Sequence, residues 1–108
     1  MRDFLFVDDL AYAVVFALEN KLSNHLYNVG SGKEITIKEL ANTIQNIINH
    51  KGKIVWDTSK PNGTPRKLMD ISKIKSLGWK HSTNLELGIK KTYQWYLNNK
   101  SNLKEIKL

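Results

Sequence analysis

The chain has 108 residues and no cysteine, which excludes a disulfide framework, a thiolate metal site and a cysteine nucleophile within it. Hydrophobic residues make up 41% and charged residues 25%, the balance of a soluble globular protein with one small core. The longest apolar run, Leu10 to Leu18, is too short to span a bilayer, and no signal peptide precedes it. We therefore expect no membrane partner, and the lack of cysteine fits a cytoplasmic location.

Basic residues dominate the charge, since 17 lysines and arginines against 10 acids give a net charge of +7 and a pI of about 9.7. Such a balance fits nucleic acid, an anionic membrane or a phosphate-bearing ligand. Nearly all of the excess is lysine spread along the chain, and only two residues are arginine. We interpret most of it as solvated surface charge and do not expect a nucleic-acid partner.

The chain opens with the bulky residues 2–7, which predict a short strand. Asp8 or Asp9 is then positioned to cap a helix over residues 9–19. Apolar side chains lie all round that helix, namely Leu10, Ala11, Ala13, Val14, Val15, Phe16, Ala17 and Leu18. A helix that is apolar on every side is covered by more than one neighbour, so we expect self-association or a missing neighbouring domain.

Residues 26–29 predict a second strand, which Gly30-Ser31-Gly32 ends. Thr36 and Glu39 have capping-box spacing, and apolar residues at helical spacing follow them to about residue 51. This stretch therefore predicts a strand, a tight turn and an amphipathic helix in succession.

The Gly-Ser-Gly turn resembles two phosphate-binding patterns and completes neither of them. Ile35 stands where the dinucleotide fingerprint has its third glycine, and Glu34 stands where a P-loop has serine or threonine. We interpret the turn as structural, because glycine adopts the backbone angles that such turns require. No cofactor site is expected in it.

Residues 53–57 predict a third strand, and the polar 58–67 loop with both prolines follows it. Asp70 is positioned to cap a short helix that Gly78 ends. A last helix is predicted over residues 84–98.

Thr83 and Glu86 at the start of that last helix have capping-box spacing. Short strands thus alternate with about four helices and hairpin signals are lacking, which predicts an α/β fold.

Few residues indicate catalysis. Tyr96 and Lys100 have the Y-x-x-x-K spacing of short-chain reductases, in which the ammonium lowers the pKa of the tyrosine. No cofactor loop accompanies the pair, so we attribute the spacing to chance. His25, His50 and His81 lack metal-ligand spacing. The sequence therefore offers no catalytic residue and no metal site.

Two features could bind an anion. Arg2 carries a planar guanidinium, which suits bidentate phosphate binding. The 58–67 loop holds Lys60, Arg66 and Lys67, and its prolines limit the entropy lost when it closes on a ligand. Composition alone favours an ordinary basic surface loop.

Several stretches resemble the extended short-chain dehydrogenase/reductase superfamily. R-D-F-L-F-V-D-D-L-A (2–11), N-V-G-S-G (28–32) and I-T-I-K-E-L-A (35–41) carry this resemblance in chain order. The stretch W-D-T-S-K-P-N-G-T-P-R-K-L-M-D-I-S-K-I-K-S-L-G-W (56–79) is similar to the GDP-L-fucose synthase family. T-Y-Q-W-Y-L-N-N (92–99) resembles the last helix of the same enzymes.

That resemblance implies an NADP-dependent bifunctional enzyme, which epimerises GDP-4-keto-6-deoxy-mannose at C3 and C5 and then reduces the C4 ketone. In such enzymes the cofactor loop and the catalytic residues of both reactions lie upstream of the part that this chain matches. The resemblance therefore assigns no catalytic residue here, and we expect NADP in the full-length enzyme but not on this chain.

Three substrate contacts follow from the resemblance. Arg2 stands at the family arginine that binds the diphosphate of GDP, and Lys67 stands at a lysine on the phosphate side. Asn62 stands where relatives often have an aspartate that contacts the sugar nucleotide. An amide oxygen still accepts a hydrogen bond but carries no charge, so affinity or nucleotide choice could differ.

The sequence therefore predicts residues 1–108 to be the carboxy-terminal, sugar-nucleotide-binding portion of an extended Rossmann-type reductase, without its N-terminal NADP-binding Rossmann domain. Met1 stands inside the family sequence, so we expect a truncated gene product or an excised fragment, inactive alone, with a GDP-sugar as its small-molecule partner. The alternatives are a fragment of another sugar-nucleotide epimerase or dehydratase, and a freestanding basic module that binds phosphate or RNA.

Overall fold

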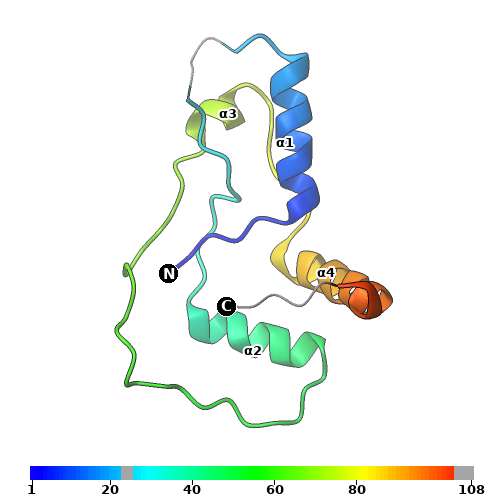
Figure 1. Cartoon of the computed structure of the whole chain (residues 1–108). Coiled ribbons are helices and arrows are strands. Elements are labelled where there is room, and N and C mark those ends of the chain that lie inside the picture. The colour runs from blue at the N-terminus through cyan, green and yellow to red at the C-terminus, as the bar shows by residue number, and fades with distance from the viewer. Residues whose placement is uncertain (23–25, 104–108) are drawn as a thin grey trace.

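The computed structural model describes residues 1–22 and 26–103. Its elements are α1 (Val7–Glu19), α2 (Ile37–Ile47), α3 (Ser72–Ser76), α4 (Leu85–Asn99) and the short 3-10 helix η1 (Lys100–Asn102). Figure 1 shows α1 and α3 at one end of the molecule and α2 and α4 at the other. The four predicted helices are confirmed.

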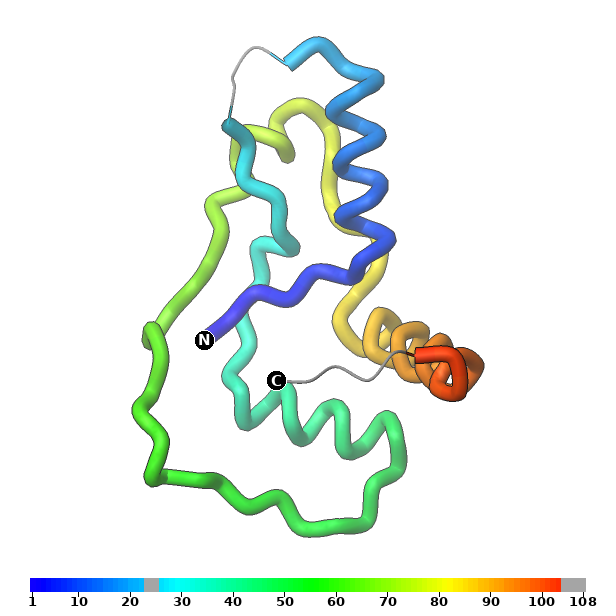
Figure 2. Tube along the Cα trace, viewed as in Figure 1, coloured from blue at the N-terminus to red at the C-terminus, as the bar shows by residue number. Residues whose placement is uncertain are grey.

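The predicted strands are not confirmed, because residues 1–22 and 26–103 contain isolated bridges and no strand. Arg2 pairs with Ile35 in antiparallel fashion and with Lys67 in parallel fashion, where the amino-terminal segment crosses its neighbours (Figure 2). A strand is stable only when a partner extends the ladder. Residues 26–29 and 53–57 form neither a strand nor a bridge within the described chain.

Helix capping follows the sequence at α2 and departs from it at α1. Thr36 and Glu39 form the predicted capping box, with each side chain bonded to the other residue's backbone N–H. The prediction that Asp8 or Asp9 caps the first helix is wrong, because α1 starts at Val7 and its N-cap Phe6 has no capping side chain. Asp9 therefore lies inside the first turn, where its side chain turns to another segment.

The two later caps are each displaced by one residue. Asn84, and not Thr83, caps α4 and accepts a hydrogen bond from the Leu87 amide at 2.8 Å. Ile71 is the N-cap of α3, while Asp70 accepts from the Ser72 amide at 3.0 Å in a local turn. Gly78, at φ 105°, ends the short helix as predicted, since that backbone angle favours glycine.

The core is small and lies between α1 and α3. Three hydrophobic side chains are buried, Ala13, Ile74 and Trp79, and partly buried neighbours pack on them. The chain exposes 9022 Å², against about 6,100 Å² for a compact monomer of its mass. Its radius of gyration is 16.7 Å, against about 13 Å for a compact domain of this length. The molecule is therefore open, and much of its apolar surface is uncovered.

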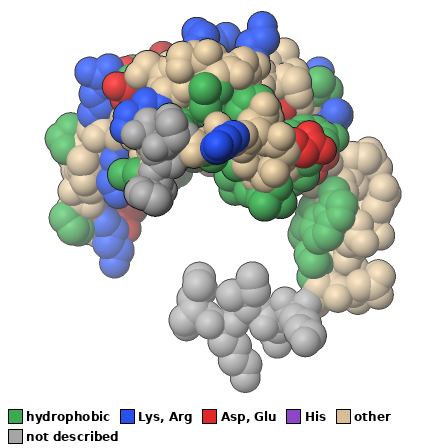
Figure 3. Space-filling model, turned by 90° about the horizontal axis from the view of Figure 1, so that it is seen from above, with side chains coloured by type: hydrophobic (Ala, Val, Ile, Leu, Met, Phe, Trp, Pro, Cys, Tyr) green, Lys and Arg blue, Asp and Glu red, His purple; other side chains and the backbone are tan. Residues whose placement is uncertain are grey.

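Exposed apolar side chains lie on several elements, and the space-filling view shows them at the surface of a hollowed molecule (Figure 3). On α1, Val7 is 67% exposed and Leu18 is 82% exposed. None of the helices in the described ranges is long and apolar enough to cross a membrane.

Candidate anion-binding surface

Arg2 is the residue around which three distant segments meet. Its backbone exchanges two hydrogen bonds of 2.9 Å with Ile35, one in each direction. On its other side, the Lys67 amide donates to the Met1 carbonyl at 3.1 Å. The chain thereby places two of the three sequence-predicted site residues, Arg2 and Lys67, on adjoining backbone segments.

The Arg2 guanidinium lies against the 58–67 loop. Its Nη1 donates to the Met1 carbonyl at 2.9 Å, which fixes the side chain along the surface. A Cβ built on Gly63 would lie 3.3 Å from Nη2, so the loop backbone passes directly beside the guanidinium. Asn62, the third predicted residue, immediately precedes this glycine and is exposed. We call Arg2, Asn62, Gly63 and Lys67 the Arg2 surface.

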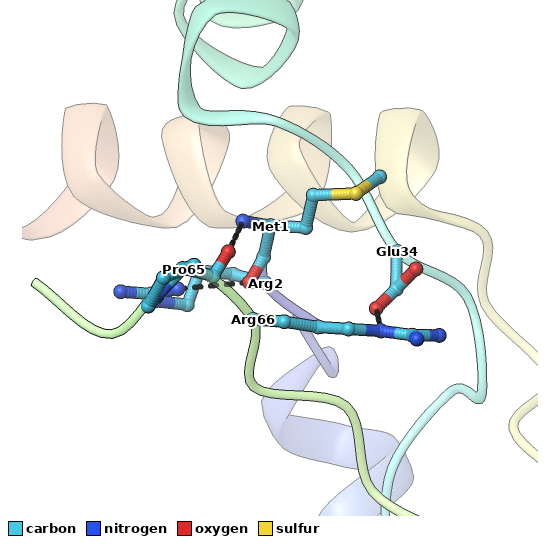
Figure 4. A network of polar contacts seen from close by, with 5 residues as sticks. All are labelled: Met1, Arg2, Glu34, Pro65 and Arg66. Carbon is cyan, nitrogen blue, oxygen red and sulfur yellow. Dashed lines mark hydrogen bonds and ion pairs between the residues drawn. The ribbon is translucent and has the colours of Figure 1, made fainter.

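Two further contacts hold the end of the loop to the rest of the chain (Figure 4). The Met1 amino group donates to the Pro65 carbonyl at 2.6 Å. The Arg66 Nε donates to the carboxylate of Glu34, and the Arg66 guanidinium points away from that of Arg2. This is the one ion pair among the described residues. Of the loop's cations, Arg66 is therefore neutralised locally.

The start of the loop is shaped by Asp57, which accepts from the Ser59 hydroxyl and from the Ser59 amide at 2.9 Å. The side-chain hydrogen bond and then the backbone one lower the pKa of Asp57, so it stays ionised at neutral pH. Between its two ends the loop is exposed throughout. The Arg2 surface is thus open. A groove of about 630 Å³ is lined by Arg66 and residues of the segment leading into α3, and none of the four residues of the Arg2 surface lines it.

The Gly-Ser-Gly turn binds the carboxylate of Asp3, a residue of the same chain. The Asp3 carboxylate accepts from the Ser31 hydroxyl, from the Ser31 amide at 3.2 Å and from the Gly32 amide at 3.0 Å. A Cβ at Gly30 would lie 2.7 Å from Asp3 Oδ2, and Gly32 has φ 75°, so both positions require glycine. The structure therefore supports the structural interpretation of this turn.

Asp9 makes a similar contact that the sequence analysis missed. Its carboxylate is 1% exposed and accepts from the Ser82 amide at 3.0 Å, the Ser82 hydroxyl at 2.8 Å and the Thr83 amide at 3.0 Å. Burial raises the pKa of Asp9, but these hydrogen bonds and the nearby His81 outweigh it, so the net pKa is lowered. No local spacing signals a contact across more than 70 residues.

The remaining sequence candidates do not come together. His50 and His81 belong to different segments, and His25 lies outside the described residues. No group of three or more metal-ligating side chains occurs in the part of the chain that the structure describes. Tyr96 lines an apolar groove between α2 and α4, with Ile44 and Ile48 on the opposite wall.

That groove has a volume of about 700 Å³, and its walls are almost wholly hydrophobic. Residues of the amino-terminal segment, α2 and α4 line it, including Phe4, Phe6, Leu40, Ile89 and Tyr93. A groove of this composition between helices is a packing surface for apolar side chains rather than a site for a charged ligand.

Comparison with known proteins gives the class of protein, because the solved structures that resemble this chain are Rossmann-type reductases. The model of the NAD dependent epimerase/dehydratase family matches residues 1–30. The relatives described next resemble the chain over most of its length, which agrees with this match.

Relatives at 45–54% identity are GDP-L-fucose synthases. GDP-L-fucose synthase 1 of Arabidopsis thaliana is 50% identical over 102 residues, which are 94% of this chain and 32% of the relative. The GDP-L-fucose synthase of Escherichia coli (strain K12) is 45% identical over 109 residues, covering 92% of this chain and 34% of the relative. A GDP-L-fucose synthetase of Naegleria fowleri, solved bound to NADP, superposes with a TM-score of 0.88 at 30% identity, covering 96% of this chain and 33% of that one.

The chain thus spans about a third of the length of the curated relatives that it matches, at their carboxy-terminal end. The predicted resemblance is confirmed, and the comparisons do not favour another sugar-nucleotide enzyme or a freestanding phosphate- or RNA-binding module.

Proposed function

We propose that this chain supplies the GDP-sugar-binding surface of a GDP-L-fucose synthase and is inactive without an NADP-binding Rossmann domain. The observation that carries the proposal is the arrangement around Arg2, where Lys67 lies on the neighbouring segment and Gly63 passes beside the guanidinium. Two cations on adjoining segments suit the two phosphates of a nucleoside diphosphate, since arginine binds phosphate through paired N–H donors.

In this proposal Arg2 and Lys67 contact the diphosphate, and Asn62 contacts the nucleotide or the sugar through its amide. Proton and hydride transfer belong to the cofactor domain, where relatives of this class bind NADP. The expected location is the cytoplasm, which is consistent with the absence of cysteine.

The uncovered surface supports a domain-sized neighbour. The chain exposes about 2,900 Å² more than a compact monomer of its mass. A standard protein interface buries only about 800 Å² on each partner. The exposed apolar residues of α1 and the groove between α2 and α4 are the surfaces we propose the nucleotide-binding domain covers. In its absence, the same surfaces would drive self-association.

The test is a titration of the 108-residue chain with GDP, followed by NMR chemical shifts of the Arg2 surface. We expect binding with a Kd of roughly 1 mM or tighter, because few contacts form without the second domain. Arg2→Gln should weaken binding about tenfold, since it removes charge-assisted hydrogen bonds. Lys38→Gln on α2 makes the same charge change away from the surface and should bind like the unmodified chain.

Two outcomes, besides a failure of the unmodified chain to bind GDP, would refute the proposal. One is equal weakening by Arg2→Gln and Lys38→Gln, which would show that only net charge matters. The other is NADPH oxidation when the chain is mixed with GDP-4-keto-6-deoxy-mannose, which would show that the chain is active alone. Competition between GDP and UDP for the chain reports the nucleotide preference.

A further inference from the structure

We infer that Glu34 is a positioning residue, whose ion pair with Arg66 holds the 58–67 loop so that Lys67 and Arg2 face the same diphosphate. The inference rests on the proposed function and concerns a residue to which neither the resemblance nor the comparisons assign a role. In this inference Arg66 anchors the loop and does not contact the diphosphate directly.

The first argument is where the pair lies in the backbone. Glu34 immediately precedes Ile35, which exchanges two hydrogen bonds with Arg2. Arg66 immediately precedes Lys67, whose amide donates to Met1. The Glu34–Arg66 ion pair therefore joins the two segments that flank Arg2, and it closes a ring of contacts around that residue (Figure 4).

The second argument is burial. The Glu34 side chain is only 17% exposed, while that of Arg66 is 65% exposed. A shielded carboxylate needs a cationic or hydrogen-bonding partner, and Arg66 reaches across from the loop to provide one. The contact therefore ties the exposed loop to a shielded carboxylate in the segment before α2.

The third argument concerns charge. A carboxylate beside the loop would repel a diphosphate if it were unpaired, and Arg66 neutralises it. Neither Arg2 nor Lys67 forms an ion pair within the described residues. The division of roles is therefore that Arg66 fixes the loop, while Arg2 and Lys67 retain their charge for the ligand.

The loop has few other anchors. Residues 58–67 are all exposed, and apart from the contacts of Met1 with Pro65 and Lys67, its long-range fixation comes from this pair. A partly shielded ion pair changes an equilibrium by up to about fivefold. Loss of the pair should therefore loosen the loop without unfolding the chain.

The experiment compares the full chain with Glu34→Gln, Arg66→Gln and the charge-swapped double variant Glu34→Arg/Arg66→Glu. Hydrogen exchange of the Lys67 amide measures the order of the loop, and calorimetric or NMR titration with GDP measures binding. We expect each single variant to speed Lys67 exchange and weaken GDP binding about three- to fivefold. The swapped variant should recover most of both losses, which a merely structural loss of either side chain would not do.

Glu86→Gln on α4 makes the same charge change as Glu34→Gln and should alter neither measurement. Unchanged Lys67 exchange in both single variants would overturn the inference, and so would GDP binding that stays equal or becomes tighter in Glu34→Gln. If the unmodified chain fails to bind GDP, the proposed function is refuted. The exchange rates and their recovery in the swapped variant then still decide whether Glu34 orders the loop.

Discussion

Replacing Asp9 with asparagine should destabilise the chain markedly, although the two side chains have nearly the same shape. Asp9 is 1% exposed and accepts three hydrogen bonds, two from Ser82 and one from Thr83. The asparagine oxygen could keep the Ser82 contacts in weakened, uncharged form. Its amide nitrogen would then face the Thr83 N–H, so that two donors oppose each other and the third bond is lost.

The magnitude follows from these contacts. Net contributions of hydrogen bonds to charged groups are about 1.5–3 kcal/mol, and uncharged ones contribute about half as much. Losing one bond and weakening two by about half should therefore lower the free energy of unfolding by about 3–6 kcal/mol. That is a large share of the stability of a chain whose described residues include only three buried hydrophobic side chains.

Urea unfolding followed by tryptophan fluorescence measures this effect. Trp79 is 6% exposed and lies in the segment that Asp9 holds, while Trp56 and Trp95 are about half exposed and should change little. Asp8→Asn is the matched control, because Asp8 is exposed in the same helical turn and its loss should cost less than about 1 kcal/mol. An Asp9→Asn variant as stable as Asp8→Asn would show that the carboxylate does not hold the two segments together.

The pH dependence gives an independent check. Because the pKa of Asp9 is lower in the folded chain than its unfolded value of about 3.9, this carboxylate contributes its full stability above that pH. The contribution is lost as pH falls through the folded pKa. The stability difference between the unmodified chain and Asp9→Asn should therefore be constant from pH 5 to 7 and should shrink below about pH 4. A difference that persists unchanged at pH 2 would contradict the lowered pKa.

Two further predictions concern the ligand surface and the open faces. Gly63→Val should weaken GDP binding about fivefold, because a side chain added 3.3 Å from Arg2 Nη2 displaces the guanidinium. Stability should change little, since the loop is exposed. Thr64→Val, also in the loop, should have a smaller effect on binding. Leu18→Glu should reduce self-association of the chain in sedimentation experiments, since Leu18 is 82% exposed at the end of an apolar helix, and an unmodified chain that is monomeric at high concentration would contradict that reasoning.

The helices could be predicted because their signals are local. The apolar spacing after Thr36 and the capping box with Glu39 specified α2, and Gly78 specified the end of α3. Asn84 displaced Thr83 as a cap because both residue types can cap a helix and their positions differ by one. Strand formation could not be predicted in the same way, since a β-ladder needs a pairing partner that the local sequence does not specify.

The candidate site was predictable only in part, and for the same reason. The residue types of Arg2 and Lys67, together with the family resemblance, indicated phosphate binding. Their placement on adjoining segments depends on backbone bonds between residues more than 60 positions apart. Glu34 gave no signal at all, because a glutamate before a helix is unremarkable until the loop that holds Arg66 folds back beside it.

Three carboxylates join segments of the chain that a larger hydrophobic core would hold together in a compact domain. Asp3 holds the turn at Ser31, Asp9 holds the segment before α4, and Glu34 holds the loop. Each of them joins segments that are far apart in sequence, and each does so by accepting hydrogen bonds. A chain built this way can keep its binding segments in register while its apolar faces remain uncovered. The Asp9 contact should be lost in acid before the helices melt, because the pKa of Asp9 is lowered in the folded chain and its protonation removes an acceptor while leaving the helical backbone bonds intact.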